Sequence, residues 1–220
     1  MGILYVVATP IGNLEDITLR ALRILKEVDL IACEDTRRTG ILLKHYNIEK
    51  PLVSFHQHSK LQKIDFLIER LKSGKNIALV TDAGTPGISD PGGVLIAEAI
   101  KNNIKVESIP GPSALAAILA VSGIAADKFL FLGYLPKKKG RQTLIQKISQ
   151  SEIPVVLFES PHRIIDNLKS IRGFAGDRYV IIGRELTKKF EEILRGKISE
   201  VLPKIRSQGE FVIVITNIQI

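Results

Sequence analysis

The chain alternates between two patterns of apolar and polar positions along most of its length. Short unbroken apolar runs are typical of strands buried on both faces, whereas apolar residues three or four positions apart are typical of amphipathic helices. In the first half, strands are predicted at 3–8, 30–33, 52–55, 77–81 and 105–109. Helices are predicted at 18–28, 37–46 and 61–74, and from Asp90 as N-cap to about Asn102. Strands separated by helices indicate a largely parallel sheet covered on both faces.

The second half repeats this alternation less regularly. Strands are predicted at 129–135, 155–159, 179–186 and 210–215. Helices are predicted from Ser113 to about Ser122, and at 141–150, 163–171 and 197–206. The segment IPGPS (109–113) sets two prolines around a glycine and is the best candidate for a hinge. We therefore expect an α/β protein of two domains, residues 1–110 and residues 111–220.

Composition excludes several classes of protein. Of the 220 residues, 45% are apolar and 25% charged, the balance of a globular protein that buries a core. The longest apolar run, residues 114–126, is too short and too rich in small residues to span a bilayer, so no membrane partner is expected. The first predicted strand begins at Ile3, which leaves no signal peptide to recognise. Cys33 is the sole cysteine, so an internal disulfide is impossible, and we expect a cytoplasmic protein.

Positive charge is concentrated in the second half of the chain. The formal net charge is +8. Residues 1–110 hold 14 Lys and Arg against 13 Asp and Glu, a net charge of +1, while residues 111–220 hold 17 against 10, a net charge of +7. Such an excess is compatible with ordinary solubility. It also fits a surface that faces a polyanion such as RNA.

Loops rich in glycine and proline follow several predicted strands. The longest, TDAGTPGISDPGG, spans residues 81–93, and shorter ones are ATPIGN (8–13), IPGPSA (109–114) and ESPHR (159–163). One such loop could be a tight turn that needs glycine only for its backbone angles. Ligands of open α/β sheets bind beyond the carboxyl ends of strands, and bare backbone lets a flat ligand approach closely. Four loops of this kind therefore favour a ligand site.

Familiar site motifs are missing. A phosphate-binding Walker loop would need a glycine where Glu69 stands, and the dinucleotide fingerprint G-x-G-x-x-G does not occur. His56 and His58 alternate near a predicted strand end without an evident third ligand, so no metal site is predicted. No nucleophile and base can be paired by spacing.

Six motifs, in order along nearly the whole chain, resemble one known family. They are ATPIGNLEDITLRA (8–21), CEDTR (33–37), DAGTPGISDPG (82–92), PGPSA (110–114), GYLP (133–136) and ESPHR (159–163). They are similar to the signatures of the ribosomal RNA small subunit methyltransferase I family, which belongs to the tetrapyrrole-methylase-like class. Tyr134 stands where phenylalanine is commoner in that family, and longer members carry a small extra C-terminal domain beyond the strand that ends this sequence.

The resemblance implies a fold, a cofactor and a reaction. The class has two α/β domains, with a mostly parallel sheet in the first, a mixed sheet in the second, and S-adenosylmethionine bound in the cleft between them. Members usually form homodimers. The family reaction is 2′-O-methylation of a cytidine ribose in the decoding region of 16S rRNA, either free or within the small ribosomal subunit.

The resemblance also implies which residues hold the cofactor, mostly in the first domain. Gly84, Thr85 and Ile88 would hold its methionine part through the loop backbone, while Phe158 and Glu159 would approach from the second domain. The remaining expected cofactor contacts are Pro10, Gly12, Asp82, Gly87, Ser113 and Ala114.

RNA contacts are expected mainly in the basic second half. The turn PKKKGR (136–141) groups three lysines and an arginine, which either contact phosphates or form a solvated loop. The expected RNA-binding residues are Asn13, Asp35, Arg37, Lys137, Lys138, Lys139, Arg141, Arg163 and Arg184. A ribose hydroxyl needs a base or a cation that stabilises the alkoxide, and Glu185 and Lys188 are the candidates for these catalytic roles. A salt bridge between the two is the plain alternative.

Two other functions remain open at this point. One is a methyltransferase of the same fold that acts on a tetrapyrrole, against which the basic second half argues. The other is a non-catalytic RNA-binding protein. Aromatic residues make up 5% of the chain and tryptophan is missing, so surfaces for stacking RNA bases are scarce.

Overall fold

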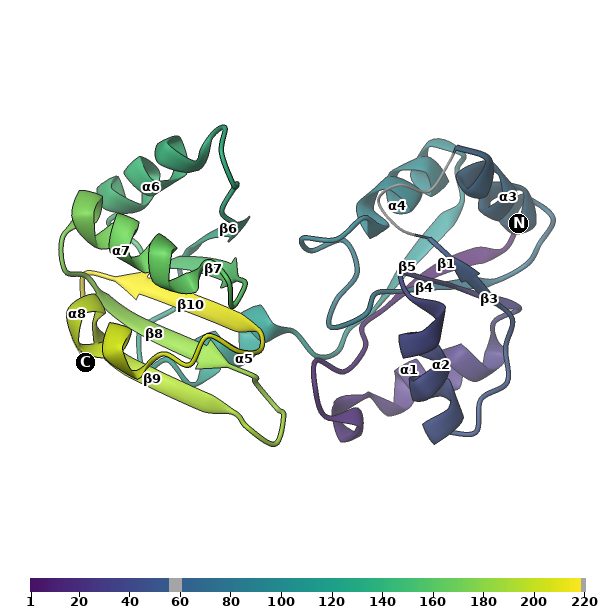
Figure 1. Cartoon of the computed structure of the whole chain (residues 1–220). Helices are drawn as coiled ribbons and strands as arrows, with labels where there is room; N and C mark the ends of the chain where they lie inside the picture. The colour runs from purple at the N-terminus through teal and green to yellow at the C-terminus, as the bar shows by residue number, and fades with distance from the viewer. Residues whose placement is uncertain (56–60, 219–220) are drawn as a thin grey trace. The chain divides into compact units, whose positions relative to one another are not determined.

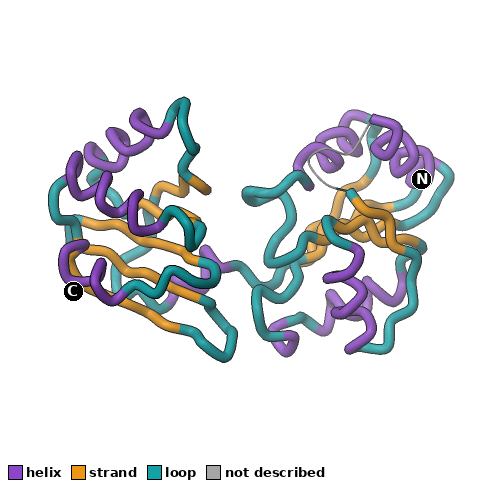
Figure 2. Tube along the Cα trace, viewed as in Figure 1, coloured by secondary structure: helices purple, strands orange, loops and turns teal. Residues whose placement is uncertain are grey.

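The computed structural model describes residues 1–55 and 61–218 (Figure 1). Contacts divide the chain into two compact units, Met1–Ser113 and Ala114–Ile220. We call them the first and the second unit. Each is an α/β structure in which helices and strands alternate along the chain (Figure 2).

The first unit is built on a parallel sheet of five strands. In chain order these are β1 (Ile3–Val7), β2 (Leu30–Cys33), β3 (Leu52–Ser54), β4 (Ile77–Val80) and β5 (Lys105–Ile109). Their order across the sheet is β3-β2-β4-β1-β5, and every neighbouring pair is parallel. This confirms the expected parallel sheet.

Helices cover both faces of this sheet. On one face lie α1 (Leu19–Glu27) and α2 (Thr36–His45), and on the other α3 (Leu61–Lys72) and α4 (Gly92–Lys101) (Figure 1). In β4, Ala78 and Val80 join the core under α1 and α2, whereas Ile77 and Leu79 join the core under α3 and α4. A strand buried on both faces reads as an unbroken apolar run, which explains why this strand was predicted from its sequence.

The second unit has a mixed sheet, as the resemblance implied. Its strands are β6 (Leu130–Tyr134), β7 (Val155–Glu159), β8 (Tyr179–Arg184), β9 (Glu192–Lys197) and β10 (Phe211–Thr216). Their order is β6-β7-β10-β8-β9, and only β6 and β7 are parallel neighbours. Its helices are α5 (Ala114–Ala120), α6 (Arg141–Gln150), α7 (Ile164–Ala175) and α8 (Ile198–Val201).

Two predictions for the second unit were wrong. Strand β9 was missed because its sequence, EILRGK, mixes charged and apolar residues and forms an edge of the sheet. The helix predicted at 197–206 is only the short α8, followed by the 3₁₀ turn Leu202–Lys204. Pro203 lies in that turn and cannot donate the hydrogen bond that a longer helix would need.

One helix start in the first unit also differs from its prediction. Helix α4 begins at Gly92 with Pro91 in the cap position, so Asp90 precedes the cap. A short 3₁₀ turn, η1 (Leu14–Asp16), precedes α1.

Within residues 1–55 and 61–218, none of the helices has the length and apolar character needed to cross a membrane. The same ranges contain no cluster of three or more His, Cys, Asp or Glu side chains that could hold a metal ion. The histidines considered above, His56 and His58, lie outside the described residues.

Candidate functional site

The carboxyl ends of all five strands of the first unit meet at one edge of its sheet, because the strands are parallel. The loops after β1, β2, β4 and β5 start there. These loops, together with the first turn of α2, carry every first-unit residue that the sequence predicted for a site: Pro10, Gly12, Asn13, Asp35, Arg37, Asp82, Gly84, Thr85, Gly87, Ile88 and Ser113. We call this edge the first-unit loop cluster.

Hydrogen bonds to backbone carbonyl groups tie three loops of this cluster together. The Thr9 amide donates to the Gly84 carbonyl at 2.9 Å, and the Gly84 amide donates to the Thr9 carbonyl at 3.0 Å. The Thr85 hydroxyl donates to the Pro112 carbonyl at 3.3 Å. The loops after β1, β4 and β5 therefore form one connected structure.

Asp90 shapes the glycine-rich loop after β4. One of its oxygens, Oδ1, accepts hydrogen bonds from the amides of Gly87 at 2.8 Å and Gly92 at 2.7 Å. Its other oxygen, Oδ2, is buried and has no hydrogen-bond partner among the described residues. Gly84 has a φ of 86° and Gly87 a φ of 88°, a left-handed conformation that glycine adopts without strain. The loop therefore needs its glycines for its shape, and Asp90 fixes that shape.

Asp82 joins the loop after β4 to the loop after β2. Its Oδ1 accepts the Asp35 amide at 3.0 Å, and its Oδ2 lies 3.5 Å from Nε of Arg38. The Thr81 hydroxyl makes a parallel link by donating to Glu34 Oε2 at 3.0 Å. Residues that directly follow β2 and β4, together with Arg38 of α2, thus interact at this edge.

Asp35 and Arg37 form an ion pair that also begins a helix. Asp35 is the N-cap of α2, where its Oδ1 accepts the Arg37 amide at 2.8 Å. Nη2 of Arg37 lies 2.6 Å from Asp35 Oδ2, while 88% of the Arg37 side chain is exposed. The hydrogen bonds from Arg37 hold the pKa of Asp35 far below its ordinary value. Asp35 stays ionised at neutral pH and leaves the Arg37 guanidinium accessible.

A cavity of about 210 Å³ opens within the first-unit loop cluster. Its lining residues come from the loops after β1 and β4 and from α2: Thr9, Pro10, Leu14, Arg38, Thr39, Ile41, Leu42, Thr81 and Asp82. The sequence predicted Pro10 and Asp82 for a site but missed Thr9, Arg38 and Ile41. Helical spacing could have indicated Arg38 and Ile41, since they lie three positions apart on α2, directly after the CEDTR motif.

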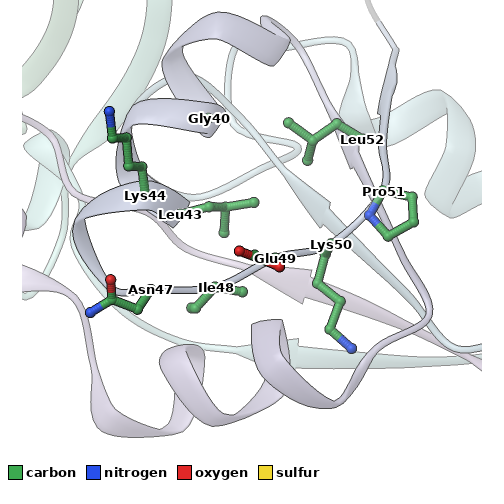
Figure 3. A pocket seen from close by; sticks show the side chains of 9 residues that line it. All are labelled: Gly40, Leu43, Lys44, Asn47, Ile48, Glu49, Lys50, Pro51 and Leu52. Atoms are coloured by element: carbon green, nitrogen blue, oxygen red, sulfur yellow. The ribbon is translucent and has the colours of Figure 1, made fainter.

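A larger cavity of about 570 Å³ lies elsewhere in the first unit. The end of α2, the connection after it and the start of β3 line it (Figure 3). A connection from helix to strand lies at the amino ends of parallel strands, so this cavity is at the opposite edge of the sheet from the loop cluster. None of the predicted site residues lines it.

In the second unit, predicted residues gather at one edge of the mixed sheet. The strand register aligns Tyr134 with Phe158, Glu159 with Phe211, and Phe211 with Arg184. The segment with Lys137, Lys138 and Lys139 follows β6 at this edge. We call this end of the sheet, where β6, β7 and β8 end and β10 begins, the second-unit basic edge. The three lysines are exposed, and the described residues offer them no ion pair.

A buried polar network lies behind this edge. Glu159 is only 2% exposed; its Oε1 accepts the Ser160 amide at 2.7 Å and lies 3.3 Å from Nη2 of Arg163, and its Oε2 accepts from Asn167. The side-chain oxygen of Asn167, Oδ1, accepts from Nε and Nη2 of Arg141 at 2.9 and 2.6 Å. Both arginines are thus oriented by buried groups, beside a hollow of about 510 Å³ that Lys169 also lines.

The two catalytic candidates, Glu185 and Lys188, form a salt bridge with each other, which is the alternative to a catalytic role considered above. Nζ of Lys188 lies 2.9 Å from Glu185 Oε1 and 3.0 Å from Glu210 Oε2. Partial burial opposes ionisation of both groups. Their mutual hydrogen bond nevertheless leaves the pKa of Glu185 lowered and the pKa of Lys188 raised, with Glu210 supporting both shifts. Both groups therefore stay charged at neutral pH.

The backbone around Glu185 is held in an uncommon conformation. Glu185 has a φ of 52° and Thr187 a φ of 65°. Gly209 packs so closely on the Glu185 side chain that a Cβ there would lie 2.6 Å from it. Such conformations persist only where the surrounding structure imposes them, and they are common at functional sites. The remaining predicted arginine, Arg184, is nearly buried and paired with Glu192 at 2.9 Å.

Comparison with known proteins gives consistent results. The family model for Tetrapyrrole (Corrin/Porphyrin) Methylases matches residues 3–202. The chain is 48% identical to the ribosomal RNA small subunit methyltransferase I of Thermotoga maritima, over 99% of each protein. It is 47% identical to the protein of the same name from Pasteurella multocida, over 97% of this chain and 79% of that protein.

Solved structures show the same fold at low identity. A diphthine synthase superposes with a TM-score of 0.77 at 18% identity, over 98% of this chain and 90% of that one. A uroporphyrin-III C-methyltransferase from Thermus thermophilus, complexed with S-adenosyl homocysteine, superposes with a TM-score of 0.68 at 16% identity, over 97% of each chain.

Proposed function

Because the chain belongs to the tetrapyrrole methylases and, among them, to the ribosomal RNA small subunit methyltransferase I family, we propose that it methylates a cytidine ribose of 16S rRNA at the 2′-oxygen. Methyl transfer to small-subunit rRNA is the activity that the family name states. The finer assignment, a 2′-oxygen of a cytidine in the decoding region, is part of our proposal. The observation that carries the rRNA methyltransferase activity is the near-full-length likeness to proteins of that name.

The methyl donor is S-adenosylmethionine, whose sulfonium supplies an already activated methyl group. The chemistry of the loop after β4 suits this cation. Residues 82–93 contain Asp82 and Asp90 and no lysine, arginine or histidine, and their glycines expose backbone carbonyl groups. We propose that Gly84, Thr85 and Ile88 bind the cofactor. Further contacts would come from Pro10, Gly12, Asp82, Gly87, Ser113, Ala114 and, in the second unit, Phe158 and Glu159.

The acceptor RNA would bind chiefly to the second unit. Arg141 and Arg163 are held in place by Asn167 and Glu159, so their guanidinium groups lose little freedom when they meet a phosphate. We propose the exposed lysines 137–139 as further RNA contacts. Arg184 is only 8% exposed and is paired with Glu192, so we propose that it supports this end of the sheet rather than contacting phosphates. In the first unit, Asn13, Asp35 and Arg37 would face the acceptor nucleotide. We further propose that the protein acts as a homodimer.

Positioning would account for most of the catalysis. Holding an acceptor oxygen in line with an activated methyl group is worth about 7–11 kcal/mol. Lys188 stays protonated at neutral pH, so we propose that it stabilises the developing alkoxide. Glu185 has a lowered pKa and is a weak base; its part would be to orient Lys188 through their 2.9 Å contact.

The proposed reaction is tested with radiolabelled cofactor, offered to small-subunit particles and to free 16S rRNA. We expect label in rRNA and, after digestion, a 2′-O-methylated cytidine. A base-methylated nucleoside would contradict the ribose assignment. Label that enters a tetrapyrrole instead of rRNA would contradict the proposed function altogether.

Replacing Lys137, Lys138 and Lys139 together by alanine should make RNA binding less sensitive to salt. Each phosphate contact to single-stranded nucleic acid adds about 0.7 to the slope of log affinity against log salt, so we expect the slope to fall by roughly 2. Binding is measured by filter retention at several salt concentrations. The control replaces Lys72, Lys75 and Lys101, which are exposed in the first unit and paired with acidic residues. Equal slopes for the two triple variants would mean that residues 137–139 form a solvated loop that makes no phosphate contacts.

A further inference from the structure

Tyr134 is a half-exposed aromatic residue on a rigid support. It ends β6 at the second-unit basic edge, with 50% of its surface exposed. Its ring packs against Phe158, with ring centres 5.6 Å apart and planes at 58°. Phe158 in turn packs edge-on against Phe131 at 5.0 Å. Three aromatic rings on two neighbouring strands therefore fix the Tyr134 ring while leaving part of it open to solvent.

Charged groups surround this ring. Arg163 donates to the carbonyl of Leu135, the next residue in the chain, at 2.7 Å. The pKa of Tyr134 is raised by burial and by the charges of Glu210 and Glu159, against the opposing charge of Arg163. Both carboxylates are paired, Glu210 with Lys188 and Glu159 with Arg163. The exposed lysine segment begins three residues further along the chain, so the ring lies in a setting suited to nucleic acid.

Other exposed aromatic residues lack this combination. Phe66 has the Arg70 guanidinium over its ring at 5.1 Å, and Phe190 has the Lys189 amine over its ring at 5.6 Å. Phe174, 57% exposed, lies in the last turns of α7. Only Tyr134, among the exposed aromatic residues that the structure describes, is backed by further aromatic rings at a basic edge.

We propose that the Tyr134 ring stacks on an unpaired base of the RNA substrate. The inference rests on the proposed function, since it takes RNA as the acceptor, and it adds a contact to a base where the lysines and arginines would contact phosphates. Bases in loops and bulges of RNA are recognised by stacking on aromatic side chains, and every base offers a face for this. A ring that is already fixed loses little freedom on binding.

The test separates stacking from charge. Tyr134→Ala and Tyr134→Phe are compared with the wild-type protein in binding a 16S rRNA transcript at several salt concentrations. We expect Tyr134→Ala to weaken binding about 5- to 150-fold at every salt concentration without changing the slope, because stacking neutralises no phosphate. Tyr134→Phe should bind like wild type, since the hydroxyl makes no hydrogen bond to the residues that the structure describes. Phe174→Ala is the control for loss of an exposed ring.

Several results would overturn the proposal. Unchanged RNA affinity of Tyr134→Ala would show that the ring does not contact RNA. An equal loss of affinity for S-adenosylhomocysteine, measured by calorimetry, would place the ring in the cofactor site. A changed oligomeric state in sedimentation would place it in a protein contact. If the wild-type protein neither binds nor methylates rRNA, the proposed function fails and this proposal with it; if only the variant series fails, the function stands.

Discussion

Valine in place of Gly87 is expected to lower cofactor affinity and methyl transfer by about 10- to 100-fold while both units stay folded. Gly87 has a φ of 88°, which a β-branched residue adopts only with strain of about 1–3 kcal/mol. A Cβ at this position would meet only Ile96, at an ordinary 3.5 Å, so crowding adds little. The exposed loop would relax instead, and the backbone groups that we propose for cofactor binding would move. Each 1.4 kcal/mol corresponds to a tenfold change in affinity.

Calorimetry with S-adenosylhomocysteine and a methyl-transfer assay measure the two effects. The matched control is Gly93→Val. Gly93 is exposed in the first turn of α4, has no positive φ, and a Cβ there would have no heavy atom within 4 Å. Circular dichroism checks that both variants are folded. If Gly87→Val binds the cofactor as tightly as Gly93→Val does, the glycine-rich loop lies outside the cofactor site.

Glu159→Ala is expected to destabilise the second unit by about 3 kcal/mol, the lower end of the cost of removing one partner from a buried ion pair. Arg163 and Asn167 would both lose an acceptor, and the Arg163 side chain is only 26% exposed. Arg141 would be affected in turn, since it donates to Asn167. RNA binding should therefore weaken together with stability.

Urea unfolding measures the loss of stability, and hydrogen exchange in peptides of α7 shows whether the loss lies in the second unit. Glu27→Ala is the control, because Glu27 forms an exposed pair with Arg23 at 2.9 Å and such pairs contribute less than about 1 kcal/mol. A destabilisation no larger than that of the control would mean that, in Glu159→Ala, water replaces the hydrogen bonds of Glu159 without loss of stability. Cofactor affinity, measured on Glu159→Gln, tests the separate proposal that Glu159 contacts the cofactor. We expect the affinity to fall, and an unchanged affinity would mean that the Glu159 carboxylate serves only the second unit.

The sequence predicted strands well where burial is complete and poorly where it is partial. Strand β4 is buried at all four positions and was predicted within one residue. Strand β9 is the outermost strand of its sheet, and its sequence shows no clear alternation of apolar and polar residues, so it was missed. Its stability comes from pairing with β8 along its whole length, from Tyr179 to Arg184. Such pairing is a tertiary effect that local periodicity does not record.

For the candidate site, the sequence indicated loops rather than interactions. The glycine-rich loop after β4 and the acidic residues after β2 were both recognised, but not the hydrogen bond from the Asp35 amide to Asp82, which joins positions far apart in the chain. Arg141 and Arg163 were predicted to bind RNA, but their internal partners, which the structure shows, were not predicted. Buried acceptors such as Asn167 cannot be assigned to a particular arginine before the strands and helices are placed.

Cys33 makes the chain a convenient background for site-directed labelling. It is the sole cysteine, it is fully buried at the end of β2, and burial raises the pKa of its thiol. Thiol reagents react with the thiolate, so the native protein should remain unmodified. One cysteine introduced at exposed Asp65 on α3 and another at exposed Gln146 on α6 would then carry all of the label. Energy transfer or spin-label distances between these two positions, measured before and after cofactor and RNA are added, would test whether the separation of the two units changes, without any need to remove a native thiol first.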